Sequence, residues 1–92
     1  MIFMNVEDVF SSRLRMRVIK SLMNIGELNV SEIARRLGAN YQTTKKHLQI
    51  LEDEGIIKHK IFGRIRLYRL NRSSLKMKAV QNLIEVWDRD ES

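Results

Sequence analysis

The stretch Asn40–Gly55, NYQTTKKHLQILEDEG, decides how this chain is expected to fold. Asn40 is a strong N-cap residue, because its side-chain oxygen can accept a hydrogen bond from an unpaired amide of the first helical turn. Gly55 suits the left-handed backbone that ends many helices. Between these two signals a stripe recurs at helical spacing, at Thr44, Leu48 and Leu51. We therefore predict one helix over this stretch, with one face directed at a core.

The two ends of this predicted helix differ in charge. Its last turn carries three consecutive acids, Glu52, Asp53 and Glu54, which oppose the helix dipole at that end. Its first turns carry side chains that can donate hydrogen bonds to phosphates and base edges, namely Tyr41, Gln42, Thr43, Lys45 and Lys46. This arrangement favours a helix that meets DNA with its N-terminal end and points its acidic end away.

The composition limits the class of protein. The chain has 92 residues, a net charge of +6 and no cysteine, which fits one small domain without disulfides or thiolate metal sites. The positive charge favours an anionic partner, nucleic acid before membrane. The apolar start Met1–Met4 lacks a basic leader, and no apolar run has the length of a membrane span. We therefore expect no signal peptide, no transmembrane helix and a cytoplasmic location.

Two helices are expected at the start of the chain. A short one covers Val6–Ser11, and Ser12 caps a longer one that runs from Arg13 to about Ile25. The longer helix has an apolar stripe at Leu14, Val18, Leu22 and Ile25. Its basic residues lie largely off that stripe, at Arg13, Arg15, Arg17 and Lys20. We interpret them as a solvated face, with contacts to a DNA backbone as the alternative.

The next helix is predicted over Glu32–Leu37, after a short extended link, with Ser31 as its cap and Gly38 as its end. A three-residue turn then leads into the helix that follows Asn40. A helix, a short glycine-containing turn and a second helix form the helix-turn-helix pattern, here over residues 31–55. Such helix pairs also occur in proteins that never bind DNA, so the pattern alone does not decide the function.

After Gly55 the apolar period changes from helical to extended. Two strands, Ile56–Phe62 and Ile65–Leu70, are expected to form a hairpin, with a turn at Gly63 and Arg64. From Ile56 to Lys78 the chain has eight lysines or arginines and no acid, which favours contact with phosphates. The hairpin, over residues 56–70, therefore resembles a wing. Both of its faces are partly apolar, so the outer face is either covered by the N-terminal segment or a second chain, or left exposed.

A last helix is predicted from Leu75 to about Trp87, within residues 74–88. Its apolar stripe consists of Met77, Val80, Leu83, Ile84 and Trp87. The stripe packs either on its own domain or on the same helix of a second subunit, and we favour the dimer because a small domain has limited core for another amphipathic helix. The tail Arg89–Ser92 is expected to fray. The whole chain, residues 1–92, is thus one domain, mainly α with a small β-hairpin.

A specific pattern begins with SEIARRLG at 31–38 and continues with Thr43, His47-Leu48, Leu51-Glu52 and EGII at 54–57; Gly63-Arg64 and Tyr68-Arg69-Leu70 add to it. This pattern resembles the ArsR-like winged-helix regulators, with small archaeal members as the nearest. The resemblance implies a homodimeric regulator of transcription that binds double-stranded DNA. It places Asn40, Gln42, Thr43 and Lys46 at the major groove, His47 near the backbone, and Arg64 and Arg66 at the wing tip.

The chain departs from the metal-sensing members of that family. Those members use cysteine pairs or clusters of His, Asp and Glu, whereas this chain has no cysteine, and His47 and His59 have no ligand cluster beside them in the sequence. We therefore expect no metal, no cofactor and no identifiable small-molecule effector.

The preferred hypothesis is a DNA-binding regulator whose helix over residues 40–54 enters the major groove, with Gln42 as the best reader of adenine. The wing, residues 58–69, would contact the adjacent backbone or minor groove. The expected DNA-binding residues are Asn40, Tyr41, Gln42, Thr43, Lys45, Lys46, His47, Lys60, Arg64, Arg66 and Arg69. The alternatives are a winged-helix module that binds another protein and a non-specific architectural DNA binder. An enzyme is not expected, because no catalytic arrangement of side chains is visible.

Overall fold

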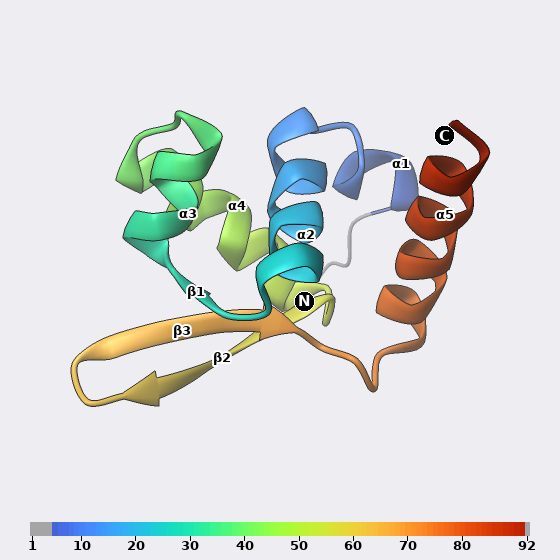
Figure 1. Cartoon of the computed structure of the whole chain (residues 1–92). Coiled ribbons are helices and arrows are strands. Elements are labelled where there is room, and N and C mark those ends of the chain that lie inside the picture. Colours follow the sequence, from blue (N-terminus) through green and yellow to red (C-terminus); the bar gives the residue numbers. More distant parts are fainter. Residues whose placement is uncertain (1–4, 92) are drawn as a thin grey trace.

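The structure is a computed structural model that describes residues 5–91. The expectation about the apolar start Met1–Met4 and the last residue of the tail, Ser92, lie outside these residues. Figure 1 shows the elements in chain order. They are α1 (Val6–Val9), α2 (Arg13–Ile25), β1 (Leu28–Asn29), α3 (Val30–Leu37), α4 (Tyr41–Asp53), β2 (Ile57–Phe62), β3 (Ile65–Leu70) and α5 (Leu75–Glu91).

The predicted fold class is confirmed: the chain forms a winged helix-turn-helix, mainly α with one small antiparallel sheet. The sheet has the strand order β1-β3-β2, with Leu28 opposite Tyr68 and Ile57 opposite Leu70. Helices α2, α3 and α4 lie on one side of the sheet, and the β2–β3 hairpin extends beyond them as the wing (Figure 1). The stretch that forms β1 was expected only as an extended link, because two residues are too few to show a strand period.

The two helices of the helix-turn-helix start at asparagine caps. The Asn40 Oδ1 atom accepts a hydrogen bond of 2.8 Å from the Thr43 amide, as predicted. The cap of α3, however, is Asn29 and not Ser31, which corrects the sequence prediction. Asn29 and Glu32 exchange hydrogen bonds of 2.9 and 3.1 Å and so form a capping box. Because this box satisfies two amides at once, it starts the helix ahead of the serine.

The core lies between the helices and the inner face of the sheet. Fully buried side chains come from every layer, among them Ile19, Leu22, Ile33, Leu48, Leu51 and Ile57. Tyr68 and Leu70 of β3 face this core, as strand alternation predicted, whereas Ile65 and Leu67 lie on the other face. The apolar outer face of the hairpin is therefore only partly covered: Leu67 is half-buried, and Ile65 is exposed.

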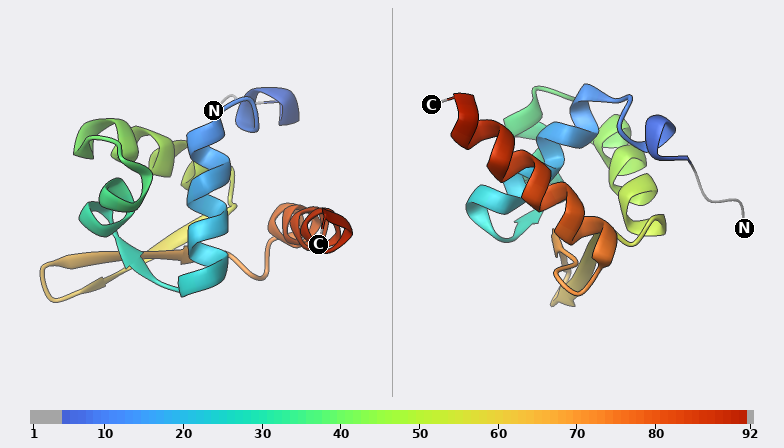
Figure 2. Two further views of the ribbon diagram at one scale, coloured as in Figure 1. Left: turned by 45° about the horizontal axis from the view of Figure 1, so that its top comes forward. Right: turned by 90° about the vertical axis from the view of Figure 1, so that its right-hand side faces the viewer.

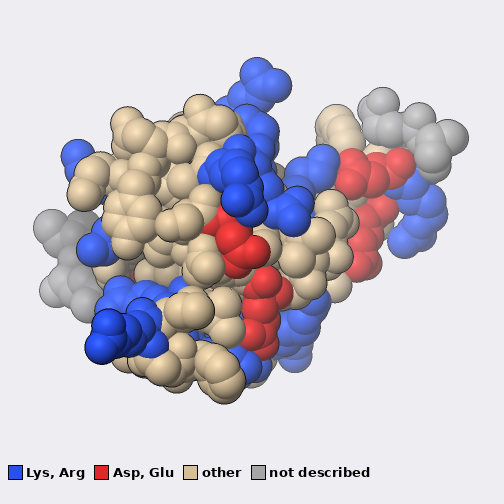
Figure 3. Space-filling model, turned by 60° about the vertical axis from the view of Figure 1, so that its left-hand side comes forward, with Lys and Arg blue, Asp and Glu red and all other residues tan. Residues whose placement is uncertain are grey.

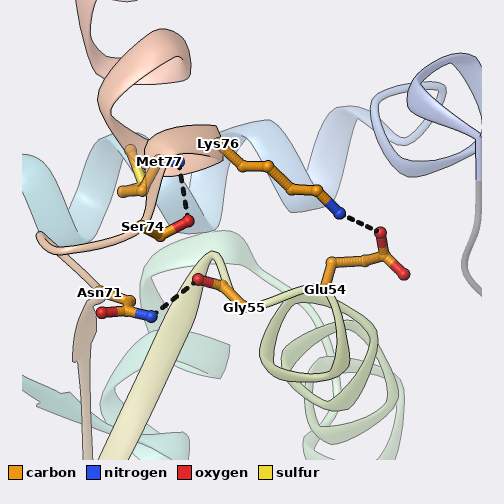
Figure 4. Close-up of polar contacts among 6 residues, drawn as sticks. All are labelled: Glu54, Gly55, Asn71, Ser74, Lys76 and Met77. Carbon is orange, nitrogen blue, oxygen red and sulfur yellow. Dashed lines mark hydrogen bonds and ion pairs between the residues drawn. The ribbon is translucent and has the colours of Figure 1, made fainter.

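The start of α5 is tied to the end of α4 and of β3 by polar contacts (Figure 4). Asn71 donates a hydrogen bond of 3.0 Å to the Gly55 carbonyl, and the Ser74 hydroxyl accepts one of 3.2 Å from the Met77 amide. The Lys76 ammonium lies 3.2 Å from the buried Glu54 carboxylate. These contacts fix the start of α5 to the end of α4, and α5 lies at the end of the molecule away from the wing tip (Figure 2).

The apolar stripe predicted for α5 divides between two environments. Met77, Val80 and Ile84 are buried in the core of their own chain, so the assignment of these three residues to a dimer interface is corrected. Leu83 and Trp87 are 56% and 64% exposed. The helix also continues to Glu91 instead of fraying after Asp88, because no glycine or proline interrupts it and the Asp88 carboxylate lies 3.7 Å from the Lys20 ammonium.

Candidate nucleic-acid interface

The start of α4 and the wing tip lie on the same side of the molecule and enclose a hollow of about 380 Å³, which we call the wing hollow. It is lined by Asn29, Val30, Ser31, Tyr41, Lys45, Arg64, Ile65, Arg66 and Tyr68. Residues 41 and 45 are one turn apart on α4, so both side chains point to the same side of the helix. The fold thus brings together four of the predicted DNA-binding residues: Tyr41, Lys45, Arg64 and Arg66.

The wing hollow is electrically positive. Three of its lining residues, Lys45, Arg64 and Arg66, are cations, and the lining contains no acid. A side-chain hydrogen bond with Tyr68 is the largest of the effects that raise the pKa of Arg66, so this guanidinium stays charged. Ser31, which the sequence suggested only as a helix cap, also lines the hollow with an exposed side chain. Three cations beside hydroxyl groups are the donors that a phosphate backbone requires.

Four further predicted contact residues, Asn40, Gln42, Thr43 and Lys46, belong to the cap or the first two turns of α4 but do not line the wing hollow. Gln42 and Lys46 are exposed and make no hydrogen bond to other described residues, so their polar atoms are available to a partner. Asn40 is also exposed, but its side-chain oxygen is occupied by the cap. Thr43 is half-buried, and Thr44 is fully buried with its hydroxyl bonded to the Asn40 carbonyl at 2.9 Å. Apart from Gln49, which is bonded to Asp53, the exposed donors of α4 thus belong to its first two turns.

Two predicted residues, Lys60 and Arg69, lie on the opposite face of the sheet from Arg66 and Tyr68. Their strand positions show this, since Lys60 is opposite Leu67 and Arg69 is opposite Lys58. The Lys60 ammonium lies 3.2 Å from the Glu27 carboxylate. The structure therefore separates these two basic residues from the wing hollow, because adjacent residues of a strand alternate between its faces.

Figure 3 shows the side of the molecule that carries the wing tip and the start of α4. Lysine and arginine side chains lie on this side in separate groups, one at the lower left and another in the upper half. A few acidic groups lie among them. A partner with regularly spaced negative charges, rather than one compact anion, matches this distribution.

Arg15 is a feature that sequence reasoning missed. It was expected on a solvated or DNA-facing surface, but it is buried and only 7% exposed. Its guanidinium donates to the Val9 carbonyl at 2.7 Å and to the Asp8 carbonyl at 2.8 Å, and it lies 3.1 Å from Nδ1 of His47. No spacing rule shows such a contact, because the three partners lie on two other helices or their ends. Arg17 likewise reaches out of α2, to the Leu37 carbonyl at 3.2 Å.

His47, which was predicted to contact the DNA backbone, is half-buried beside Arg15. Burial, and then the positive charge of Arg15, lower the pKa of His47 below its ordinary value of 6.5. The ring is therefore neutral at pH 7. Its Nδ1 atom accepts the hydrogen bond from Arg15, and the ring proton lies on Nε2.

The lowered pKa of His47 predicts a loss of stability in acid. The unfolded chain takes up this proton at about pH 6.5, whereas the folded chain takes it up only at lower pH. The contribution is therefore complete above about pH 6.5 and is lost as the pH falls through the folded-state pKa. Urea unfolding at about pH 8 and about pH 5.5 should show a larger drop in unfolding free energy for the natural protein than for His47→Gln. Equal drops in the two proteins would contradict the lowered pKa of His47.

The three acids at the end of α4 each have a partner within the chain. Glu52 contacts Nδ1 of His59, Asp53 accepts a hydrogen bond of 2.8 Å from Gln49, and Glu54 pairs with Lys76. They point in different directions, as adjacent helix residues do. Within residues 5–91, no group of three or more potential metal ligands comes together. In the same part of the chain, no helix has the length and apolar character needed to cross a membrane.

A second exposed surface lies along one side of α5, which we call the α5 flank: Leu75, Ala79, Leu83, Val86 and Trp87. Two hollows with mostly apolar linings border it. One is formed with Val6, Val9 and Phe10 near α1, and the other with Met16 and Lys20 of α2. The other side of α5 carries polar residues, including Lys78, Gln81 and Glu85. An exposed apolar row of this kind on a small domain is typical of a protein contact.

Comparison with known structures supports the fold. The homodimeric winged helix-turn-helix DNA-binding domain of a possible ArsR-family regulator from Mycobacterium bovis is 24% identical, with 92% of this chain and 76% of that chain covered and a TM-score of 0.75. The transcriptional repressor BigR from Xylella fastidiosa is 22% identical, with 92% and 82% covered and a TM-score of 0.77. HlyU from Vibrio cholerae, in its reduced form, is 22% identical, with 87% and 82% covered and a TM-score of 0.72.

Comparison with sequence families gives the more specific result. A search of curated proteins found no significant match. The model of the bacterial regulatory proteins of the arsR family matches residues 12–59, which is more than half of the 92-residue chain. The matched region contains α2, α3 and α4 and enters β2, so it includes the complete helix-turn-helix. This is a family of transcriptional regulators and not of enzymes. The chain belongs to the arsR family of winged-helix regulatory proteins.

Proposed function

We propose that the protein is a dimeric regulator of transcription that binds a specific sequence of double-stranded DNA. The observation that carries this proposal is the wing hollow, where exposed donors of the first α4 turns and the wing-tip cations face one space. A DNA backbone that runs between α4 and the wing would contact Lys45, Arg64 and Arg66. The N-terminal end of α4 would then enter the major groove beside that backbone.

Base recognition is assigned to the exposed side chains at the start of α4. Gln42 can pair with adenine through both ends of its amide, and Lys46 can reach guanine or a phosphate. Thr43 and Asn40 lie next to them, although the side-chain oxygen of Asn40 is occupied by the cap. Lys60 and Arg69 are given a smaller role than the sequence suggested, since they lie on the other face of the sheet. His47 is assigned to the contact with Arg15 rather than to DNA.

The α5 flank is the proposed dimer interface. Its exposed apolar residues lie beside two hollows with mostly apolar linings, which α5 forms with α1 and with α2. The similar domain from Mycobacterium bovis is described as homodimeric, which supports the same assembly here. Two subunits related by a dyad would present two α4 helices to half-sites about one helical turn apart, roughly 34 Å. Regulation of transcription places the protein in the compartment that holds the genome, which agrees with the expected cytoplasmic location.

Selection from random duplex DNA tests this proposal. The purified protein is incubated with the pool at moderate salt, and the bound fraction is sequenced after several rounds. We expect a palindrome whose half-site centres lie about 10 base pairs apart. A pool that stays random, with binding that collapses as salt is raised, would instead indicate an architectural DNA binder.

A second candidate function is protein recognition through the wing. It is favoured by the exposed apolar side chains near the wing tip, Ile61, Phe62 and Ile65. The same selection separates the two candidates, because a protein-binding module would recover no DNA at any salt concentration. Capture of a defined partner that is lost on Phe62→Ser would then support the second candidate.

A further inference from the structure

Arg15 joins three helical segments through one buried side chain. It starts on α2, and its Nε and Nη2 atoms donate to the carbonyls of Val9 and Asp8 at the end of α1. Its Nη1 atom donates to Nδ1 of His47, in the middle of α4. One guanidinium thus fixes the position of α4 relative to α1, although the two helices are more than 30 residues apart in sequence.

The chemistry of the contact requires arginine. The last carbonyls of a helix have no partner within it, and they form the negative end of its dipole. A guanidinium offers planar donors in several directions and can therefore satisfy two carbonyls and a ring nitrogen at once, whereas an ammonium group is a point charge. The neutral state of His47, which its lowered pKa secures, leaves Nδ1 free to accept.

The two ends of this contact belong to different surfaces. Val9 and Phe10 line the apolar hollow beside the α5 flank, which is the proposed dimer interface. His47 follows Lys46 directly and lies one turn beyond Thr43, so its position governs the exposed donors of α4. Arg15 therefore lies between the surface proposed for a second subunit and the surface proposed for DNA.

We propose that Arg15 is a positioning residue: it holds α4 in the orientation needed for DNA binding by anchoring His47 to α1. The proposal rests on the proposed DNA-binding function. A second subunit that shifts α1 would also shift α4 through this side chain. The role belongs to the Arg15–His47 pair, so His47 affects DNA affinity only while Arg15 is present.

A double-mutant cycle tests this statement. The affinity for the selected operator is measured at about pH 8 for the natural protein, Arg15→Met, His47→Leu and the double variant. We expect His47→Leu to weaken binding at least about tenfold when Arg15 is present, and by less than about twofold in the Arg15→Met protein. His47→Gln should restore binding to within about twofold, because its amide oxygen can accept the same hydrogen bond.

Two controls distinguish the loss of helix positioning in Arg15→Met from the loss of one positive charge and from unfolding. Arg72→Met removes the same charge from an exposed position in the β3–α5 loop, and it should change the affinity by less than about twofold. Urea unfolding confirms that each variant is folded at the assay temperature. If Arg15→Met does not fold, Arg15→Lys replaces it, because an ammonium keeps the charge but cannot bridge all three acceptors.

NMR signals from the end of α1 test whether Arg15 connects this helix to α4. Binding of DNA with a single half-site should shift the amide NMR signals of Asp8, Val9 and Phe10 in the natural protein and leave them unchanged in Arg15→Met. Equal effects of His47→Leu in both backgrounds would overturn the proposal, since they would indicate a direct DNA contact. Operator binding by a folded Arg15→Met protein at the natural affinity would also overturn it. Failure of the natural protein to bind any DNA would instead remove the proposed function and this role together.

Discussion

Leu83→Glu/Trp87→Glu is expected to make the protein monomeric and to weaken binding to a palindromic operator by about 10²–10⁴-fold. Both side chains are exposed on the α5 flank, so the carboxylates are tolerated in the folded monomer and are costly only in an apolar interface. In a dimer, binding of one subunit to its half-site brings the joined subunit to the second half-site at a high effective concentration. Separate monomers lose this advantage, so the affinity falls. Sedimentation measures the assembly, and fluorescence anisotropy measures the affinity.

The control for this variant lies on the same helix. Lys78→Glu makes the same change of −2 in net charge on the polar side of α5 and should leave the dimer intact. Binding to DNA with one half-site should be equal in both variants, because neither touches α4. A dimer that persists in Leu83→Glu/Trp87→Glu would place the interface elsewhere.

Lys45→Gln/Arg66→Gln is expected to weaken operator binding roughly a hundredfold at moderate salt, since each dimer would lose four phosphate contacts. The slope of log affinity against log salt should fall by about two for each subunit, because each phosphate contact contributes a slope of about 0.9. Both side chains line the wing hollow and are exposed, so the substitutions leave the core unchanged. A salt titration of the affinity measures both effects.

The matched control removes one lysine and one arginine that lie away from the wing hollow, Lys58 on β2 and Arg72 in the β3–α5 loop. Lys58→Gln/Arg72→Gln changes the net charge equally, but these side chains border a different hollow, with Gly26 and Ser73. The salt slope of this variant should stay within about one unit of the natural protein. Equal losses in both double variants would mean that net charge, and not the wing hollow, governs binding.

The sequence was most informative where local signals agreed with each other. In α4 the asparagine cap, the apolar stripe and the stop at Gly55 all indicated the same helix, and the structure confirms it. The two wing strands were likewise predicted, because β-branched residues flank a glycine turn. Gly63 has a φ of 64°, a value that favours glycine, which is why the turn was visible in the sequence.

The missed features depend on contacts between distant segments. The burial of Arg15 is set by the end of α1 and by His47, neither of which is marked by spacing in the sequence. The division of the α5 stripe has a similar cause: Met77 and Trp87 belong to one apolar pattern, but only the approach of the other helices decides which residue is covered. Ser31 and Asn29 are both good caps, and the reciprocal bonds with Glu32 select Asn29.

The structure divides the predicted DNA-binding residues between different surfaces. Periodicity alone put Lys60, Arg66 and Arg69 on one hairpin, but strand alternation separates Arg66 from the other two. The wing hollow joins Arg66 to Tyr41 and Lys45 of α4, which are more than 20 residues away in the chain. The proximity of these segments depends on the tertiary fold, so local sequence patterns do not show it.

Selection of DNA sites by the Gln42→Ala variant, in parallel with the natural protein, tests the central claim most directly. Gln42 is exposed in the first turn of α4, and its replacement leaves the core and the cap intact. If α4 of each subunit reads the major groove, the variant should lose its preference at one position of each half-site. The two relaxed positions should be symmetric about the dyad, with the rest of the palindrome unchanged. Identical sites for both proteins would contradict base reading by the start of α4.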